Sequence, residues 1–358
     1  MIRLLATSIL CFGAGLCHLA AAPVFIDEPS QDRWMYGLNT TPGTRNQAPT
    51  FSALPDFTGV DDRWGFLLFA FDTGAVIPAG LGPQAYRITS IRVTAAVGLG
   101  NNFRYDPSYD AWNTYATPAT PAAVTDTDPG RPVELHGAGF RGAWTAANFT
   151  ETSPYGGGIP GNEPPGTRNA YPLGFTQAGQ PRDVSNNITA KFESLPWAVA
   201  QTDEVAPGDL VPVETFFEFV INPTLPGVGG YLSRSLSDGR IWFSLSSLQP
   251  AVQQGGEYAS WITRDDAIHQ LFGGLAPALE MEVTLQVPLS IERDGGDVVI
   301  GWPTFAGFTH TLMASPDLST DSWTSVTSAP STTTGNTTHR VAIAPGKRFF
   351  RIEYTPNP

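Results

Sequence analysis

The sequence predicts an all-β protein, made of a jelly-roll-like β-sandwich with long loops and a small C-terminal β-sandwich. Three observations lead to this prediction. Helix-period patterns are nearly absent, short apolar or alternating runs recur along the chain, and clusters of Gly, Pro, Asn and Asp separate these runs. Many short strands divided by turn residues are typical of two sheets packed face to face.

The N-terminal residues are interpreted as a secretory signal peptide, residues 1–21. Arg3 gives a positive start, an apolar stretch follows to about Leu16, and small residues precede the cleavage point. The apolar stretch is too short to cross a bilayer. Cys11 and Cys17 both lie in this segment, so the mature chain has no cysteine for disulfides, thiolate catalysis or metal binding. We therefore expect a secreted protein, at the cell surface, in the periplasm or outside the cell.

The composition excludes several classes of partner. The chain has 33 acidic and 20 basic residues, which gives a formal net charge of -13. An acidic surface repels phosphate backbones and anionic lipid, so we expect no nucleic-acid partner and no membrane span. The chain that remains after signal removal is longer than one core usually serves, which predicts two domains. The composition predicts no particular oligomeric state.

The larger predicted domain spans residues 22–287. Its expected strands are 64–71, 87–97, 131–140, 214–221, 240–248 and 279–287. The run WGFLLFAF at 64–71 is apolar on both faces and flanked by turn residues, so it predicts a central strand buried on both sides. Alternation in the run ITSIRVTAAV places Thr89, Ile91 and Val93 on one face of a strand.

The smaller predicted domain spans residues 288–358 and contains about five strands. Asp294, Gly295 and Gly296 predict a hairpin turn that needs positive φ, and the next strand is expected to pack Trp302 into a small core. The strand ending in Trp-Pro, the SPDLSTDSW hairpin and the closing KRFFRIEY strand resemble the fibronectin-like modules at the C-termini of secreted bacterial proteins. This resemblance implies a spacer or presentation module rather than a catalytic one.

Part of the larger domain also resembles a known family. The succession LLFAFDTGAVIPAGLGPQAYRITSIRVTAAV and the later RIWFSLSSLQP are similar to strands of DNRLRE-type jelly-roll modules. That family is grouped with carbohydrate-binding modules, so the resemblance implies sugar binding. The long middle section, residues 98–212, extends beyond the family pattern, and no functional residue is carried over from it.

The run FRYDPSYDAWNTY supplies candidate residues for sugar binding, namely Tyr105, Tyr109, Trp112 and Tyr115. Pro107 interrupts the run, so the rings cannot all point into one core. Exposed Tyr and Trp rings offer flat stacking faces to sugars, and neighbouring Asp and Asn side chains bind hydroxyl groups. In the alternative interpretation the rings cover the end of the sandwich beneath a long loop.

The turn TDTDPGRP contains a candidate calcium site at Asp126 and Asp128. Calcium takes about six to eight oxygen ligands, so backbone carbonyls or remote side chains would have to complete the site. The alternative is a solvated Asp-Pro-Gly turn in which one aspartate bonds its own backbone.

An enzymatic interpretation depends on Glu134 and His136, which lie two residues apart on one face of a predicted strand, with Arg131 or Arg141 nearby. A polysaccharide lyase or hydrolase could use such a pair. The alternative is that they are solvent-facing or cross-strand partners. No motif of another reaction class occurs in the sequence.

A short loop sequence occurs twice, as PGTRNQAP at 42–49 and PGTRNAYP at 165–172. Pro-Gly presets a tight turn, and arginine can clamp a carboxylate with paired hydrogen bonds. Arg45 and Arg168 are therefore expected to be structural clasps that bond an Asp, a Glu or a backbone carbonyl. In the rival interpretation both loops share one rim and the two arginines bind an acidic sugar together.

The sequence thus favours a secreted, non-catalytic binding or surface-presentation protein, with a polysaccharide as its expected ligand and calcium as its one candidate cofactor. Two alternatives remain open: a carbohydrate-active enzyme, and a structural component of the envelope or matrix.

Overall fold

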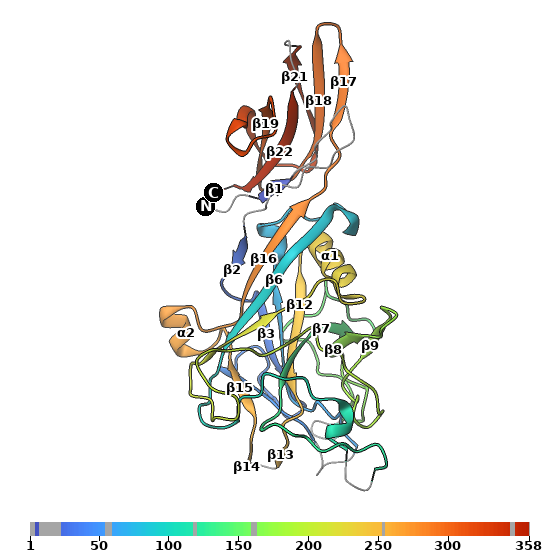
Figure 1. The fold of residues 1–358 in the computed structure, drawn as a ribbon, viewed down its shortest axis with the longest axis vertical. Helices are drawn as coiled ribbons and strands as arrows, with labels where there is room; N and C mark the ends of the chain where they lie inside the picture. The colour runs from blue at the N-terminus through green and yellow to red at the C-terminus, as the bar shows by residue number, and fades with distance from the viewer. Residues whose placement is uncertain are drawn as a thin grey trace.

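The computed structural model describes residues 4–6, 23–53, 59–116, 120–158, 163–252, 255–343 and 348–357. The chain forms a large lower part and a smaller upper part, joined where β16 rises toward β17 (Figure 1). Nearly all sheet pairs are antiparallel, and the predicted all-β sandwich is confirmed. No helix in the described ranges has the length and apolar character needed to cross a membrane.

The lower part is a sandwich of two sheets. One sheet contains β11 (Phe216–Val220), β6 (Tyr86–Ala96), β16 (Ala278–Leu285) and β2 (Val24–Ile26), and it continues through β1 (Leu4–Ala6) into the upper part. The other consists of β3 (Gln31–Met35), β5 (Phe66–Phe71), β12 (Ile241–Ser247), β7 (Val133–Phe140), β8 (Ala170–Phe175) and β9 (Pro181–Asp183), with β10 (Ala198–Val199) beside β7. Two short pairs flank them, β4 (Gln47–Thr50) with β15 (Ala259–Ile262) and β13 (Ala251–Val252) with β14 (Gly255–Gly256).

The central strand β5 is buried along its whole length, as the sequence predicted. Its odd-numbered side chains, including Phe69, enter the main core between the sheets. Its even-numbered side chains, including Leu68, enter a second apolar cluster with Phe149 and Trp242. The second sheet is therefore covered on both faces, and the polar side chains on its outer face lie beneath long loops.

The expected alternation in β6 is interrupted by a bulge. The register with β16 pairs Glu282 with Ser90 and Val283 with Ile88, so it skips Thr89. A bulge residue shifts the phase of the strand. Thr89 is exposed whereas Ile91 and Val93 are buried, so the prediction that the three share one face is wrong for Thr89, and Ile88 packs against the core in its place.

Two helices were not expected from the sequence, α1 (Val228–Asp238) and α2 (Ala267–Phe272). Gly227 and Gly239 flank α1 with φ of 81° and 82°, a backbone conformation that glycine adopts without a steric penalty. The side chain of Asp266 caps α2 by accepting from two backbone N–H groups of its first turn. Short 3-10 turns occur at Thr73–Ala75, Pro83–Ala85, Trp112–Thr114 and Thr320–Ser322.

The upper part contains two further groups of strands. One sheet is formed by β17 (Ser290–Asp294), β18 (Asp297–Thr304) and β21 (Gly335–Ala342). Facing it are β20 (Thr324–Ser331), β19 (Phe308–Ser315) and β22 (Phe349–Pro356). Between β22 and β16 lies the backbone of β1 (Leu4–Ala6), which belongs to the predicted signal peptide. The rest of residues 1–21 lies outside the described ranges, so removal of this segment stays a prediction.

The turn expected in the upper part is confirmed. Asp294 pairs with Asp297 across a two-residue turn in which Gly295 has φ of 63°. Trp302 is 3% exposed, as expected, but it belongs to the same continuous apolar cluster as Phe69 of the lower part rather than to a separate small core. Independent folding of residues 288–358 remains a prediction.

Candidate functional site

Tyr105 belongs to the core of the sandwich. It is 4% exposed, packs edge-on against Phe217 at 5.4 Å between ring centroids, and its hydroxyl accepts from the backbone N–H of Thr202 at 3.1 Å. The expectation that Tyr105 stacks on a sugar is therefore wrong, since the first part of the aromatic run fills the interior.

Tyr115 is also engaged within the protein. The guanidinium carbon of Arg131 lies 4.0 Å from the centre of its ring, at cation–π distance. Arg131 also donates to the hydroxyl and to the carbonyl of Thr114, each at 3.0 Å. One face of Tyr115 is thus occupied by Arg131, which corrects its assignment as a free stacking ring.

Tyr109 is the candidate ring that remains open at the surface, with 37% of its area exposed. Its hydroxyl donates to Oε2 of Glu193, and the backbone N–H of Trp112 donates to the same oxygen at 3.3 Å. Burial of the hydroxyl, and next the hydrogen bond to Glu193, raise the pKa of Tyr109. Tyr109 is therefore a neutral donor, and Glu193 connects the loop of Tyr109 and the half-buried Trp112 to a second loop.

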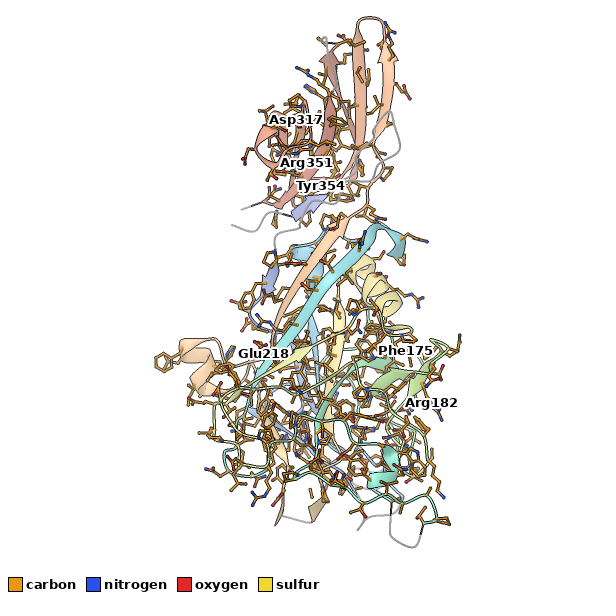
Figure 2. The ribbon with its side chains drawn as sticks, in the orientation of Figure 1. Phe175, Arg182, Glu218, Asp317, Arg351 and Tyr354 are labelled. Atoms are coloured by element: carbon orange, nitrogen blue, oxygen red, sulfur yellow. The ribbon has the colours of Figure 1, made fainter. Side chains whose placement is uncertain are left out.

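Tyr109 borders a pocket of about 270 Å³. The pocket is lined by Tyr109, Phe175, Thr176, Leu195, Pro196, Trp197, Val199, Leu225, Pro226 and Val228. Phe175 and Trp197 are stacked, with ring centroids 5.9 Å apart and planes 19° apart. Figure 2 places Phe175 at the end of β8, on the side of the lower part that also carries Arg182. The pocket thus combines aromatic walls with an apolar lining.

The segment that forms one wall of the pocket has an unfavourable backbone. Lys191 has φ of 56° and Leu195 has φ of 45°, values that L residues with large side chains seldom adopt. Between them, the ring of Phe192 lies 3.2 Å from the guanidinium carbon of Arg182. Such conformations cost about 1–3 kcal/mol each and cluster at binding sites. Leu195 lines the pocket, and Glu193, two residues before it, bonds the hydroxyl of Tyr109, which also lines the pocket.

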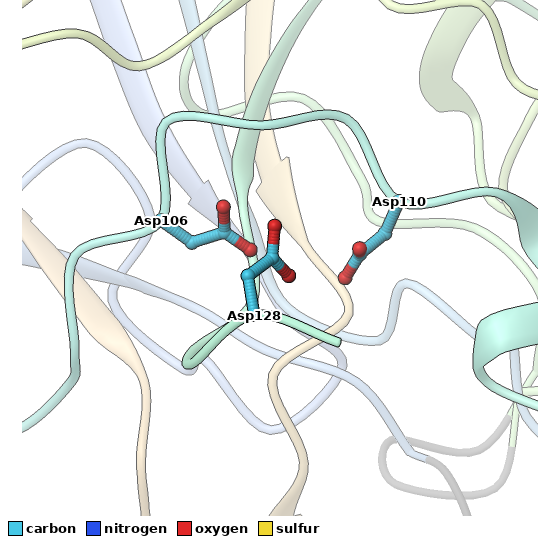
Figure 3. Close-up of side chains that lie close together, drawn as sticks. All are labelled: Asp106, Asp110 and Asp128. Atoms are coloured by element: carbon cyan, nitrogen blue, oxygen red, sulfur yellow. The ribbon is translucent and has the colours of Figure 1, made fainter. Parts of the chain in front are cut away.

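A cluster of aspartates lies on the same loop as Tyr109. Carboxylate oxygens of Asp106, Asp110 and Asp128 all lie within 4.8 Å of one another (Figure 3). Asp128 was expected to be a metal ligand together with Asp126. Instead, Asp126 pairs with Arg131 at 2.9 Å, and Arg131 also binds Asp110 at 2.6 Å. The structure thus groups Asp128 with two aspartates from the aromatic run.

The electrostatics of the cluster differ from one aspartate to the next. Burial is the main cause that raises the pKa values of Asp106, Asp110 and Asp126. Asp128 is more exposed, and the hydroxyl of Ser108, which donates to it at 2.8 Å, is the main cause that lowers its pKa. Asp106, Asp110 and Asp126 are therefore the carboxylates of this region that are costly to keep ionised.

Glu134 and His136 lie on one face of β7, as expected, but they are 2% and 0% exposed. Glu134 pairs with Arg63, which is itself fully buried, rather than with Arg131 or Arg141. Burial, and next the charge of Arg63, hold the pKa of His136 well below its usual range. A substrate has no direct access to these side chains, so their geometry is that of a structural polar cluster.

Arg168 is fully buried, on the face of the second sheet that points away from the main core. Its Nε lies 2.8 Å from Oδ2 of Asp61, and its Nη1 donates to the carbonyl oxygen of Arg63 at 2.7 Å. The guanidinium carbon lies 4.8 Å from the ring centre of Phe66. This is a clasp, and it leaves Arg168 no surface on which to bind an acidic sugar.

Arg45 behaves differently from its counterpart in the repeated loop. It is exposed, and its Nε donates to the side chain of Asn39 at 3.2 Å, neither a carboxylate nor a backbone carbonyl. Its guanidinium carbon lies 5.9 Å from the ring centre of Trp34 in β3, and its carbonyl oxygen accepts from the hydroxyl of Thr263. The expectation of two equivalent arginine clasps is therefore wrong for Arg45, and the two arginines form no joint ligand site.

In comparisons with known proteins, the chain matches no family model, no curated protein and no solved structure.

Proposed function

We propose that the protein is a secreted, non-catalytic binding protein that holds part of a polysaccharide in the pocket bordered by Tyr109, Phe175 and Leu195. The observation that carries this proposal is the pocket itself, in which aromatic walls meet a segment with two left-handed non-glycine residues. The resemblance of several strands to carbohydrate-binding jelly-roll modules agrees with it.

The chemistry of the lining suits a sugar ring. The C–H faces of sugars pack on aromatic rings, and a few polar groups at the rim then select the orientation. The exposed carboxylate of Glu193 uses Oε2 for its bonds to Tyr109 and to the backbone of Trp112, so Oε1 remains to accept from a hydroxyl.

The size and the charge of the site narrow the ligand class. A volume of about 270 Å³ lies just below the range of roughly 300–1,000 Å³ that is usual for small-molecule pockets, which suits one ring of a longer chain. The protein carries a formal charge of -13, and Glu193 places a carboxylate next to Tyr109 of the pocket lining. A neutral polysaccharide therefore fits better than an acidic one.

A glycan array probed with the secreted chain tests this proposal. We expect binding to neutral polysaccharides and weaker or no binding to acidic ones. The same polysaccharides are then incubated with the protein and assayed for new reducing ends or unsaturated ends. Such products would favour the carbohydrate-active enzyme instead, and an array without any binding would favour a purely structural component.

A further inference from the structure

The aspartate cluster contains a buried carboxylate oxygen that has no partner to balance its charge among the described residues. Asp106 is 3% exposed, and its Oδ1 accepts both from the backbone N–H of Ser108 at 2.8 Å and from its hydroxyl at 2.6 Å. Its Oδ2 is buried and has no hydrogen-bond partner among the described residues. Leaving a buried polar atom unpaired costs free energy. Figure 3 shows the Asp106 carboxylate directed toward that of Asp128.

The spacing of the carboxylates matches that of a cation site. Oxygens of Asp106, Asp110 and Asp128 lie within 4.8 Å of one another. Two oxygens that share one calcium ion at about 2.3–2.6 Å can be separated by at most roughly 5 Å. A single ion can therefore contact all three side chains without moving the loops far.

The charge of the cluster also favours a cation. Arg131 neutralises the cluster from one side only, where it pairs with Asp110 and Asp126. The carboxylates of Asp106, Asp126 and Asp128 repel one another, because they carry like charges close together. A divalent ion next to Oδ2 of Asp106 would remove this repulsion and satisfy the buried oxygen together.

We propose that Asp106, Asp110 and Asp128 form a calcium-binding site. Calcium suits the three carboxylates because it accepts irregular shells of oxygen ligands, whereas Mg²⁺ demands a near-ideal octahedron and keeps its waters. Asp126 pairs with Arg131 and lies beside the site, so it does not bind the ion. The proposal is independent of sugar binding, although the same loop carries Tyr109.

Calorimetric titration of the EDTA-treated, metal-free secreted chain with CaCl2 tests the site directly. We expect one ion per chain, with a dissociation constant on the order of 10⁻⁴ to 10⁻³ M, as in other extracellular modules. The Tm should rise with the calcium concentration, because an ion that binds the folded state alone stabilises it. D106N and D128N should each weaken binding about ten-fold or more.

Asp317→Asn is the matched control. Asp317 accepts from the backbone N–H of Ser319 at 3.0 Å and from its hydroxyl at 2.9 Å, the same turn that Asp106 makes with Ser108. It lies in the upper part of the molecule (Figure 2) and outside the aspartate cluster. This variant should bind calcium as the unchanged protein does.

Two results would overturn the proposal. One is a titration of the unchanged protein that shows neither heat nor a Tm shift at millimolar calcium. The other is calcium binding that persists unweakened in D128N. Asp128 is exposed, so this variant keeps the test valid even if D106N fails to fold.

Discussion

Arg168 and Asp61 form an ion pair inside the protein, with 2.8 Å between Nε and Oδ2 and side-chain exposures of 0% and 4%. Arg45 occupies the same position in the other copy of the repeated loop and is exposed. The same five residues therefore build a buried clasp in one place and a surface turn in the other. The difference lies in what the sandwich places next to each loop.

Replacing Arg168 with Ala should destabilise the protein strongly. The change leaves Asp61 buried without its partner, and breaking a buried pair in this way typically costs about 3–5 kcal/mol. Arg45→Ala is the natural control, because exposed substitutions usually change stability by less than about 0.5 kcal/mol. Urea unfolding followed by fluorescence measures both. Equal effects of the two changes would refute the distinction between clasp and surface turn.

Asp32 should make the protein less stable as the pH rises. Burial raises the pKa of Asp32 to about 7, from an ordinary value of 3.8. The folded state therefore keeps a proton that the unfolded state releases, and stability is lost as the pH rises from about 4 through 7. Asp32→Asn mimics the protonated form, so its stability relative to the unchanged protein should be higher at pH 8 than at pH 5. Urea unfolding at pH 5 and at pH 8 measures this difference. Its absence or reversal would mean that Asp32 does not keep its proton in the folded state.

His136 should make the protein less stable as the pH falls. Its pKa is held well below 6.5, first by burial and next by Arg63, so the folded state keeps the ring neutral. The unfolded state binds a proton below about pH 6.5, and the contribution of His136 to stability is therefore lost as the pH falls. His136→Phe, which keeps a ring without titrating, should lose less stability between pH 7 and pH 5. An unchanged slope in this variant would mean that His136 gains its proton in the folded state.

Residues 288–358 should fold without the rest of the chain. Their strands pair mostly with one another and enclose Trp302 and Tyr354. Expressed alone, the segment should unfold cooperatively with urea, and Trp302→Ala should abolish that transition by removing the centre of its core. A segment that shows no cooperative unfolding would contradict the division of the chain into two domains.

The sequence predicted the structural features that neighbouring residues specify. It missed the features that form only when distant segments of the chain pack together. The apolar run of β5 and the turn at Gly295 could be assigned because each is specified by neighbouring residues. The bulge at Thr89 breaks a period that looks continuous in the sequence. Helix α1 is rich in Gly and Ser, although its buried residues recur at helical spacing.

The candidate site shows the same limit. Phe175 and Trp197 come from separate segments and meet only through the packing of the second sheet. Asp106, Ser108 and Asp110 alternate within the aromatic run, a pattern of oxygen donors that was visible in the sequence. That Asp128 joins them, however, depends on how the long connection between β6 and β7 folds back on itself.

Polysaccharide binding in the pocket is measured by titrating a neutral polysaccharide, selected on the array, into the protein and three variants. Tyr109→Ala and Phe175→Ala each remove an aromatic wall, a loss of about 1–1.5 kcal/mol that weakens binding roughly ten-fold. Phe272→Ala removes a ring that is 78% exposed on α2, on the opposite side of the lower part from β8 and β9 (Figure 1), and should bind normally. Unweakened binding by both pocket variants, with their folding intact, would mean that this pocket does not hold the polysaccharide.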